Sequence, residues 1–456
     1  MTQYATVDPT NGRLVREFAT ISDTEVARAL DSAQAAFLTW RETDVEHRAA
    51  TLTRVAELHR EHAQEMAELM TLEMGKPISE ARREVELSAS IYDYYAIEGV
   101  DLLADEELKV NGPGRAFIRQ APIGALLGIM PWNFPYYQVA RFVAPNLLLG
   151  NTVLLKHASS CPQQALRIEE LLREAGTPDG VYQNVFASSA QVADMIAHPA
   201  IQGVSLTGSE RAGSAVGAVA GQHLKKCVLE LGGSDPLIVL PGVDIEHAVS
   251  AAVAGRFFNG GQACTSSKRI IVDTQVWDKF VAAFVEMVGE LTMGDPREEC
   301  TQLGPMASTA ARADLAAQVD DALAKGATAH VGAVVPEGDG AYYPATVLSG
   351  VTPQMRAWHE ELFGPVAVLY QVGSVDEAVA LANDSPYGLG GAVFGPDPDE
   401  AARVADRLDV GMVGVNQVIR SAPELPFGGV KNSGTGRELG RLGLEEFANK
   451  KLIRTP

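Results

Sequence analysis

The spacing of apolar positions changes once along the chain. Up to residue 100, apolar residues recur at helical spacing, for example across residues 23–40 and 48–74, and Gly75-Lys76-Pro77 interrupts the pattern. From residue 123 onwards, short β-rich runs are separated by helical stretches. We therefore predict a helical N-terminal part followed by alternating strands and helices.

The β-rich runs fall into two series. The first covers residues 124–130, 152–156, 181–186, 203–206 and 226–231, and the second covers residues 236–240, 268–272, 366–370 and 411–415. Strands that alternate with helices are typical of parallel βαβ units in a doubly wound sheet. The pattern predicts an α/β protein with a domain change near Gly232 and Gly233.

Composition narrows the class of protein. The chain has 456 residues, about three times a typical domain, so we expect two or three compact units. Its 37 basic and 58 acidic residues give a net charge of −21, which argues against nucleic acid as a partner. No basic-then-apolar leader opens the sequence, and prolines interrupt the longest uncharged run, residues 120–140. Four cysteines in so long a chain indicate reduced thiols, so we expect a cytoplasmic protein without a membrane span.

A candidate nucleophile and a candidate base lie on two glycine-rich loops. Cys264 ends the run Asn-Gly-Gly-Gln-Ala-Cys, and Glu230 lies in Leu-Glu-Leu-Gly-Gly. A thiol attacks only as the thiolate, so it needs a proton acceptor, and burial in an apolar strand would raise the pKa of Glu230 toward a useful range. Two other interpretations stay open: Cys264 as a buried apolar residue, and Glu230 as half of an ion pair. The other cysteines, Cys161, Cys227 and Cys300, lack comparable surroundings.

Asn133 lies in Pro-Trp-Asn-Phe-Pro, directly after a predicted strand. The prolines stiffen this turn, so the Asn133 amide and the Cys264 N–H are a plausible donor pair for a developing oxyanion. The alternative is an Asx turn that caps the next helix.

Two segments suggest a nucleotide site at the carboxyl ends of parallel strands, and an acid further along the chain could take part in it. Gly208, Ser209 and Gly213 mark a strand-to-helix turn, Lys156 ends a strand, and Glu361 precedes a Gly-Pro turn and can accept ribose hydroxyl groups. Each has a structural alternative: turn glycines, a solvated lysine and a helix-end acid. The usual GxGxxG fingerprint is absent.

No metal is implied by the sequence. His59 and His62 lie three residues apart on a charged helix without the HExxH pattern of a zinc site, so we expect both on the solvated surface.

In combination, these segments make the chain resemble the aldehyde dehydrogenase superfamily over nearly its whole length. The motifs are PWNFP (131–135), Lys156, TGS (207–209), ELGG (230–233), GQxC (261–264), EExFGP (360–365) and PFGGxKxSGxGRE (426–438). The resemblance implies a Rossmann-like cofactor domain, an α/β catalytic domain and a small β bridging element that joins subunits. By analogy these units take residues 1–110 with 129–232, residues 233–425, and residues 111–128 with 439–456.

The same resemblance implies a mechanism. Cys264 attacks an aldehyde to form a thiohemiacetal, Asn133 and the Cys264 N–H hold its oxyanion, hydride passes to a nicotinamide, and Glu230 activates the water that hydrolyses the thioester. It assigns Lys156 and Glu361 to the cofactor riboses and Ser209 to the phosphates. It also places Trp132 and Phe363 at the cofactor pocket.

One departure bears on the cofactor. Many NAD-preferring relatives carry Glu three residues after the strand-end lysine, whereas this chain has Ser159. A serine can bond to a 2′-phosphate that a glutamate would repel, so we expect NADP to be accepted as well as NAD.

The Lys-His-Ala-Ser segment, the short N-terminus and Arg141 are most similar to the short succinate-semialdehyde dehydrogenase branch of the family. Arg141 lies in an apolar helical stretch and needs an anionic partner, which is either a substrate carboxylate or an internal acid. Ser421 matches the substrate-entrance loop, and Phe427 belongs to the same predicted substrate site.

The resulting hypothesis is oxidation of succinate semialdehyde to succinate with NAD(P)+ by a homodimer or homotetramer. Alternatives are another aldehyde, a CoA-acylating aldehyde dehydrogenase, and a non-catalytic structural member of the family. Glu230 argues against the CoA-acylating branch, and Cys264, Glu230, Asn133 and Lys156 together argue against the structural one. No papain-like protease motif surrounds Cys264.

Overall fold

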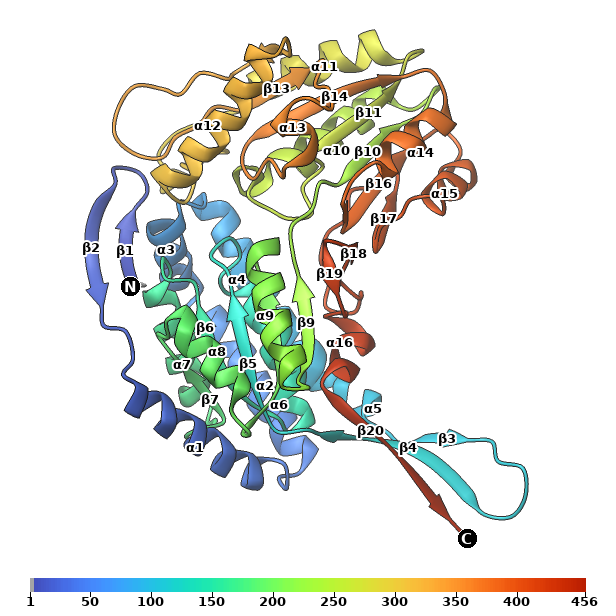
Figure 1. Ribbon diagram of the computed structural model, residues 1–456. Helices are drawn as coiled ribbons and strands as arrows, with labels where there is room; N and C mark the ends of the chain where they lie inside the picture. Colours follow the sequence, from blue (N-terminus) through green and yellow to red (C-terminus); the bar gives the residue numbers. More distant parts are fainter. Residues whose placement is uncertain (1–3) are drawn as a thin grey trace.

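A six-stranded sheet forms the core of one lobe of the computed structural model, which describes residues 4–456 (Figure 1). Its strand order is β19-β9-β8-β5-β6-β7, parallel except for β19. The strands are β5 (Ala125–Met130), β6 (Thr152–His157), β7 (Tyr182–Asn184), β8 (Ile201–Thr207), β9 (Lys226–Glu230) and β19 (Gly434–Thr435). The connecting helices are α6 (Tyr137–Leu149), α7 (Pro162–Glu174), α8 (Ser189–Ala197) and α9 (Glu210–Gln222). The first series of predicted strands is confirmed.

A seven-stranded sheet forms the second lobe, with the order β12-β13-β14-β11-β10-β16-β17 and only β12 antiparallel. Its strands are β10 (Pro236–Val239), β11 (Arg269–Asp273), β12 (Thr328–Val331), β13 (Thr346–Ser349), β14 (Val366–Val372), β16 (Gly390–Phe394) and β17 (Met412–Val415). The helices around it are α10 (Ile245–Phe257), α11 (Trp277–Gly289), α12 (Thr309–Ala324), α13 (Arg356–His359), α14 (Val375–Asn383) and α15 (Pro398–Ala405). The predicted second series of strands is present, and β12, β13 and β16 were not anticipated.

Both sheets are covered on both faces, as parallel sheets require. Along β10, Leu237 and Val239 pack with α10 and α11, whereas Ile238 packs on the opposite face with α12, α14 and α15. In the first lobe, α1, α8 and α9 cover one face and the α2–α4, α6 and α7 layer covers the other. The chain passes from one sheet to the other between Glu230, the end of β9, and Pro236, the start of β10.

The N-terminal part is helical, as predicted, with one strand pair added before it. β1 (Tyr4–Asp8) pairs with β2 (Arg13–Phe18), and both precede the helices α1 (Asp23–Trp40), α2 (Val45–Glu61), α3 (Ala63–Met74), α4 (Ile78–Ile97) and α5 (Gly99–Leu102). Ser22 and Glu25 form a capping box at the start of α1, and Gly75, with φ 78°, ends α3.

The expectation that His59 lies on the surface is wrong. His59 is 1% exposed, and its Nδ1 lies 2.8 Å from the carbonyl oxygen of Val55. Burial lowers its pKa to about 4, so the ring is neutral. Its neighbours in the sequence are charged, so the sequence pattern did not show that His59 lies on the buried face of α2.

A third, three-stranded sheet projects from the first lobe (Figure 1). Its order is β20-β4-β3, with β3 (Glu106–Leu108), β4 (Arg115–Pro122) and β20 (Ala448–Thr455). β4 and β20 lie within the ranges predicted for the bridging element, but residues 125–128 belong to β5 of the six-stranded sheet. The short strands β15 (Tyr387–Gly388) and β18 (Val430–Lys431) pair with each other, and β18 lies between the two lobes in Figure 1. The helix α16 (Gly440–Glu446) leads into β20.

Residues 4–456 contain neither a membrane-spanning helix nor a cluster of metal-ligating side chains. None of their helices combines the length and apolar character that a bilayer crossing requires. Within the same residues, no group of three or more His, Cys, Asp or Glu side chains is arranged to hold a metal ion.

Candidate active site

Cys264 follows a backbone segment that only a few residue types can form. The 3₁₀ turn η1 (Phe258–Gly261) has positive φ at Asn259, Gly260 and Gly261. A Cβ at Gly261 would collide with the carbonyl oxygen of Gly364, so glycine is needed there for steric as well as conformational reasons. This loop holds the thiol in the crevice between the two sheets.

The Cys264 thiol is not activated by its surroundings alone. Burial raises its pKa to about 12, while the positive charges of Lys268 and Arg141 act in the opposite direction. A neutral thiol is a weak nucleophile, so chemistry at this sulfur requires a base.

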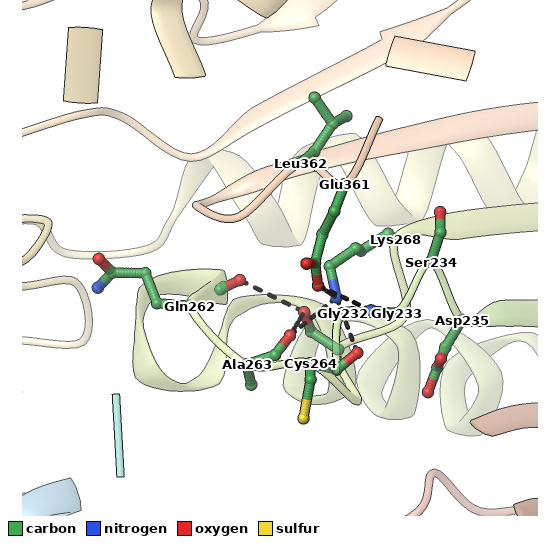
Figure 2. A network of polar contacts seen from close by, with 12 residues as sticks. Gly232, Gly233, Ser234, Asp235, Gln262, Ala263, Cys264, Lys268, Glu361 and Leu362 are labelled. Atoms are coloured by element: carbon green, nitrogen blue, oxygen red, sulfur yellow. Dashed lines mark hydrogen bonds and ion pairs between the residues drawn. The ribbon is translucent and has the colours of Figure 1, made fainter. Parts of the chain in front are cut away.

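Lys268 holds the backbone of the Cys264 loop (Figure 2). Its ammonium group donates to the carbonyl oxygens of Ala263 at 2.8 Å and Cys264 at 2.9 Å, and it lies 3.0 Å from Oε1 of Glu361. The same Glu361 oxygen accepts a hydrogen bond of 3.1 Å from the N–H of Gly233. Through Lys268, the predicted cofactor residue Glu361 is therefore linked to the loop that carries Cys264.

Asn133 also contacts the loop that carries Cys264. Its Nδ2 donates to the carbonyl oxygen of Gln262 at 3.0 Å, and its Oδ1 accepts from Gln138 at 3.2 Å. The side chain is therefore not an Asx cap of α6, whose N-cap residue is Tyr136. The alternative that Asn133 caps this helix is excluded.

A buried ion pair supports the turn that carries Asn133. Lys76 pairs with Glu84, and the Lys76 ammonium donates to the Asn133 carbonyl oxygen at 2.9 Å. Glu84 in turn accepts from the N–H groups of Tyr136 at 3.0 Å and Tyr137 at 3.2 Å. The start of α6 is thus capped by a carboxylate from α4.

Glu230 ends β9 as a nearly inaccessible carboxylate, with 2% of the residue exposed. Within residues 4–456, neither of its carboxylate oxygens has a hydrogen-bond partner. Burial raises its pKa well above the usual range; the charge of Arg141 opposes this shift and that of Glu438 reinforces it. A carboxyl group in this state holds a proton more tightly than an exposed carboxyl group does.

Arg141 forms an internal ion pair, which is one of the two interpretations that the sequence left open. Its guanidinium is 1% exposed, pairs with Glu438, and donates to Thr207 Oγ1 at 2.9 Å and to the Tyr137 hydroxyl at 3.3 Å. Tyr137 donates onward to Ser421 Oγ at 2.7 Å. The guanidinium also lies 4.5 Å from the centre of the Phe427 ring. The predicted substrate residues Arg141, Ser421 and Phe427 therefore lie together, while the carboxylate contact itself stays a prediction.

One cavity of about 940 Å³ joins these groups. The site residues that line it are Cys264, Arg141, Ser421 and Phe427, with Phe258 and Arg420 beside them. Glu230 and Asn133 are not among its lining residues. Both are linked to it through neighbours: the charge of Arg141 lowers the pKa of Glu230 and that of Cys264, and the Asn133 side chain bonds to Gln262, two residues before Cys264.

The predicted cofactor residues lie on the first lobe and on the loop before β14. Trp132 and Phe363 form an edge-to-face ring pair with centroids 5.7 Å apart. Burial lowers the pKa of Lys156, at the end of β6, and the ion pairs found within residues 4–456 do not include it. Ser159 follows β6 and is half-buried.

At the β8–α9 turn, each small residue has an internal role. Ser209 is the N-cap of α9 and accepts from the Ala212 N–H at 3.3 Å, and the Gly208 N–H donates to the Glu230 carbonyl oxygen at 3.0 Å. A Cβ at Gly213 would collide with Leu231, so that glycine allows close packing of helix on strand. The structural alternative accounts for Gly213, and the first turn of α9 still offers free N–H groups to an anion.

Sequence reasoning missed the residues that hold this site together. Lys268, Glu438 and the Lys76–Glu84 pair were not singled out. Their only local signals were the Gly-Lys-Pro break, the acid that ends the PFGGxKxSGxGRE motif, and a lysine four residues after Cys264.

The fold and the site define the class: an α/β protein of two mostly parallel sheets, with a thiol, Cys264, at its cavity and a buried carboxylate, Glu230, at the end of β9. The family follows from comparison of the sequence, which matches the aldehyde dehydrogenase family over residues 1–453. The chain belongs to this family, so the family and fold class predicted from the motifs are confirmed.

Individual relatives agree with this assignment. The succinate-semialdehyde dehydrogenase (NADP+) of Deinococcus radiodurans is 53% identical over 451 residues, 99% of this chain and 94% of that one. The Mycobacterium ulcerans protein named succinate-semialdehyde dehydrogenase (NADP+) 1 is 44% identical, over 98% of this chain and 99% of that one. The crystal structure of succinic semialdehyde dehydrogenase from Streptococcus pyogenes in complex with NADP+ is 40% identical, with a TM-score of 0.97, over 99% of this chain and 100% of that one.

Proposed function

We propose that this protein oxidises succinate semialdehyde to succinate with NADP+. The observation that carries the proposal is that Cys264 shares a cavity with Arg141 and Ser421 in a chain similar to proteins named for this reaction. A thiol next to a buried guanidinium suits a substrate with an aldehyde at one end and a carboxylate at the other.

In the first step, Glu230 takes the proton of the Cys264 thiol and the sulfur forms a bond to the aldehyde carbon. The carbonyl oxygen becomes an oxyanion, which accepts hydrogen bonds from Asn133 Nδ2 and the Cys264 N–H. When bound, the nicotinamide accepts the hydride that leaves this carbon, and a thioester remains on Cys264.

In the second step, Glu230 acts on water. Glu230 first releases the thiol proton to solvent and then removes a proton from water as the water oxygen attacks the thioester carbon. The carbon–sulfur bond breaks, the thiolate of Cys264 takes up a proton, and the carboxylic acid leaves. Burial raises the pKa of Glu230, so its base form is reached only at higher pH, and the proposal requires activity that rises with pH.

Several residues suit a dinucleotide with a 2′-phosphate. The first turn of α9, at Ser209, offers backbone N–H groups for the pyrophosphate. Lys156 and Ser159 suit the adenosine ribose and its 2′-phosphate, and Glu361 suits the nicotinamide ribose. Trp132 and Phe363 supply apolar ring faces on the same side of the site.

The direct test uses purified protein with succinate semialdehyde and either NADP+ or NAD+, followed by the absorbance of the reduced nicotinamide. A panel of aldehydes with and without a terminal carboxylate separates the substrate class. We expect turnover that Cys264→Ala abolishes and that favours the carboxylate-bearing aldehyde. Absence of turnover with every aldehyde would leave the structural alternative.

The CoA-acylating alternative has its own outcome in this assay. Added CoA would be consumed and an acyl-CoA would appear in place of succinate. We expect succinate in the presence and absence of CoA, because Glu230 activates water.

We further propose that the protein acts as a homo-oligomer in the cytoplasm. β20 is an edge strand of the projecting sheet, and its Leu452 is 63% exposed, which favours pairing with another subunit. The four cysteines are unpaired, which suits a reducing compartment. Light scattering on the wild-type protein and on Leu452→Lys distinguishes monomer, dimer and tetramer.

A further inference from the structure

Lys268 lies between two parts of the site that belong to different steps of the chemistry. It directly precedes β11, its side chain is 1% exposed, and its ammonium contacts Ala263 O, Cys264 O and Glu361 Oε1. Two of the three donors of the ammonium group bond to the carbonyl oxygens, and its charge forms an ion pair with Glu361. A buried charge held this completely is fixed in place.

The bond to Ala263 has a consequence for the oxyanion site. The Ala263 carbonyl and the Cys264 N–H belong to one planar trans peptide, so they point in opposite directions. By holding the carbonyl oxygen, Lys268 fixes the direction of the Cys264 N–H. In Figure 2, the sulfur of Cys264 points to the side opposite the Lys268 ammonium.

The third contact leads to the cofactor side. Glu361 is 18% exposed, so part of its carboxylate remains accessible while Oε1 is shared by Lys268 and the Gly233 N–H. A hydroxyl group that donates to this carboxylate competes with the ammonium and weakens the attraction between Glu361 and Lys268. The ammonium passes that change to the peptide planes on both sides of Cys264.

We propose that Lys268 is a positioning residue that couples ligand contact at Glu361 to the geometry and reactivity of Cys264. This inference rests on the proposed function in one respect, namely that the nicotinamide ribose contacts Glu361. Lys268 itself is not among the residues that line the cavity.

The test measures the reactivity of Cys264 rather than turnover. Alkylation by iodoacetamide is followed against pH by mass spectrometry of the Cys264 peptide, with the exposed Cys300 in the same sample as a reference for the reagent. In Lys268→Met, the loss of the nearby positive charge should move the alkylation profile to higher pH by about one unit or more.

Glu361→Gln is the matched variant of opposite sign. It keeps an oxygen acceptor for Lys268 and Gly233 but removes the negative charge that raises the pKa of Cys264, so its profile should move to lower pH. General loosening of the site would move both profiles in the same direction and would overturn the inference. If Lys268→Met does not fold, the sign of the Glu361→Gln shift decides alone.

Coupling is tested by adding NADP+ at saturation, with its Kd measured separately by calorimetry. We expect NADP+ to change the Cys264 alkylation rate severalfold in the wild type and in the surface control Lys325→Met, and less than about twofold in Lys268→Met. An unchanged NADP+ response in Lys268→Met overturns the inference. A wild type that does not bind NADP+ overturns the proposed function instead, and the pH shifts still judge the role of Lys268.

Discussion

The guanidinium of Arg141 is paired with the carboxylate of Glu438 inside the protein, where the two side chains are 1% and 5% exposed. Glu438 also accepts a hydrogen bond of 2.9 Å from Ser205 Oγ. This pair is adjacent to Glu230, whose pKa is raised by burial, lowered by the Arg141 charge and raised by that of Glu438. The ion pair therefore adjusts the proton affinity of the predicted base.

Glu438→Gln should shift the pH dependence of turnover. Loss of the Glu438 charge removes an influence that raises the Glu230 pKa and leaves Arg141 unopposed, so the Glu230 pKa falls. We expect the ascending limb of the kcat profile to move to lower pH by about one unit. A profile that stays in place, or moves to higher pH, would show that Glu230 does not control this limb.

Arg141→Met should separate substrate recognition from stability. If Arg141 binds the substrate carboxylate, KM for succinate semialdehyde rises about tenfold or more, against little change for an uncharged aldehyde of similar length. Steady-state kinetics with both aldehydes measures the ratio. Equal effects on the two would leave Arg141 as an internal ion pair and would remove the carboxylate contact.

The same substitution leaves Glu438 buried without its partner. Removing one member of a buried pair costs about 3–5 kcal/mol, so urea unfolding should show a loss in that range. The double variant Arg141→Met/Glu438→Gln should recover part of it. A double variant less stable than the sum of the single changes would argue against this pairing.

Gly261→Ala should abolish activity and lower stability, whereas Gly260→Ala is its matched control. Both positions have positive φ, so each alanine costs about 1–2 kcal/mol in backbone strain. Only at Gly261 does the added methyl group collide with Gly364, because at Gly260 the nearest side-chain atom lies 3.5 Å away. Thermal unfolding of the two variants gives the difference, and equal losses would contradict the steric argument.

Ser159→Glu should change cofactor preference. A carboxylate at the predicted 2′-phosphate position repels NADP+ but not NAD+, so kcat/KM for NADP+ should fall at least about tenfold relative to NAD+. Ser159→Ala is the control for loss of the hydroxyl alone. An unchanged ratio would place the 2′-phosphate elsewhere.

The sequence allowed α1, the first series of strands and the tight turn before Cys264 to be predicted because their causes are local. Residues 23–40 repeat with helical spacing and form α1 over those same residues. The glycines before Cys264 predicted a tightly turned loop, and three consecutive positive φ angles confirm this prediction. The predicted roles of Cys264, Glu230 and Asn133 remain predictions until they are measured.

The supporting contacts were not predictable because their partners lie far apart in the sequence. Arg141 required an anionic partner, but no feature of the sequence near Arg141 identified Glu438 as that partner. Glu438 lies in the segment between β19 and α16. Lys268 appeared to be an ordinary strand-start lysine, and only the fold brings Glu361 to it. His59 was misjudged for the same reason: its burial depends on the packing of α2 and not on its charged neighbours.

The central claim is that Cys264 carries the acyl group and that Glu230 releases it. The most direct measurement is intact-protein and peptide mass spectrometry of Glu230→Gln after incubation with succinate semialdehyde and NADP+. We predict an acyl adduct on Cys264 that persists in this variant and turns over in the wild type. An adduct on another residue, or aldehyde oxidation that continues in Cys264→Ala, would contradict the account.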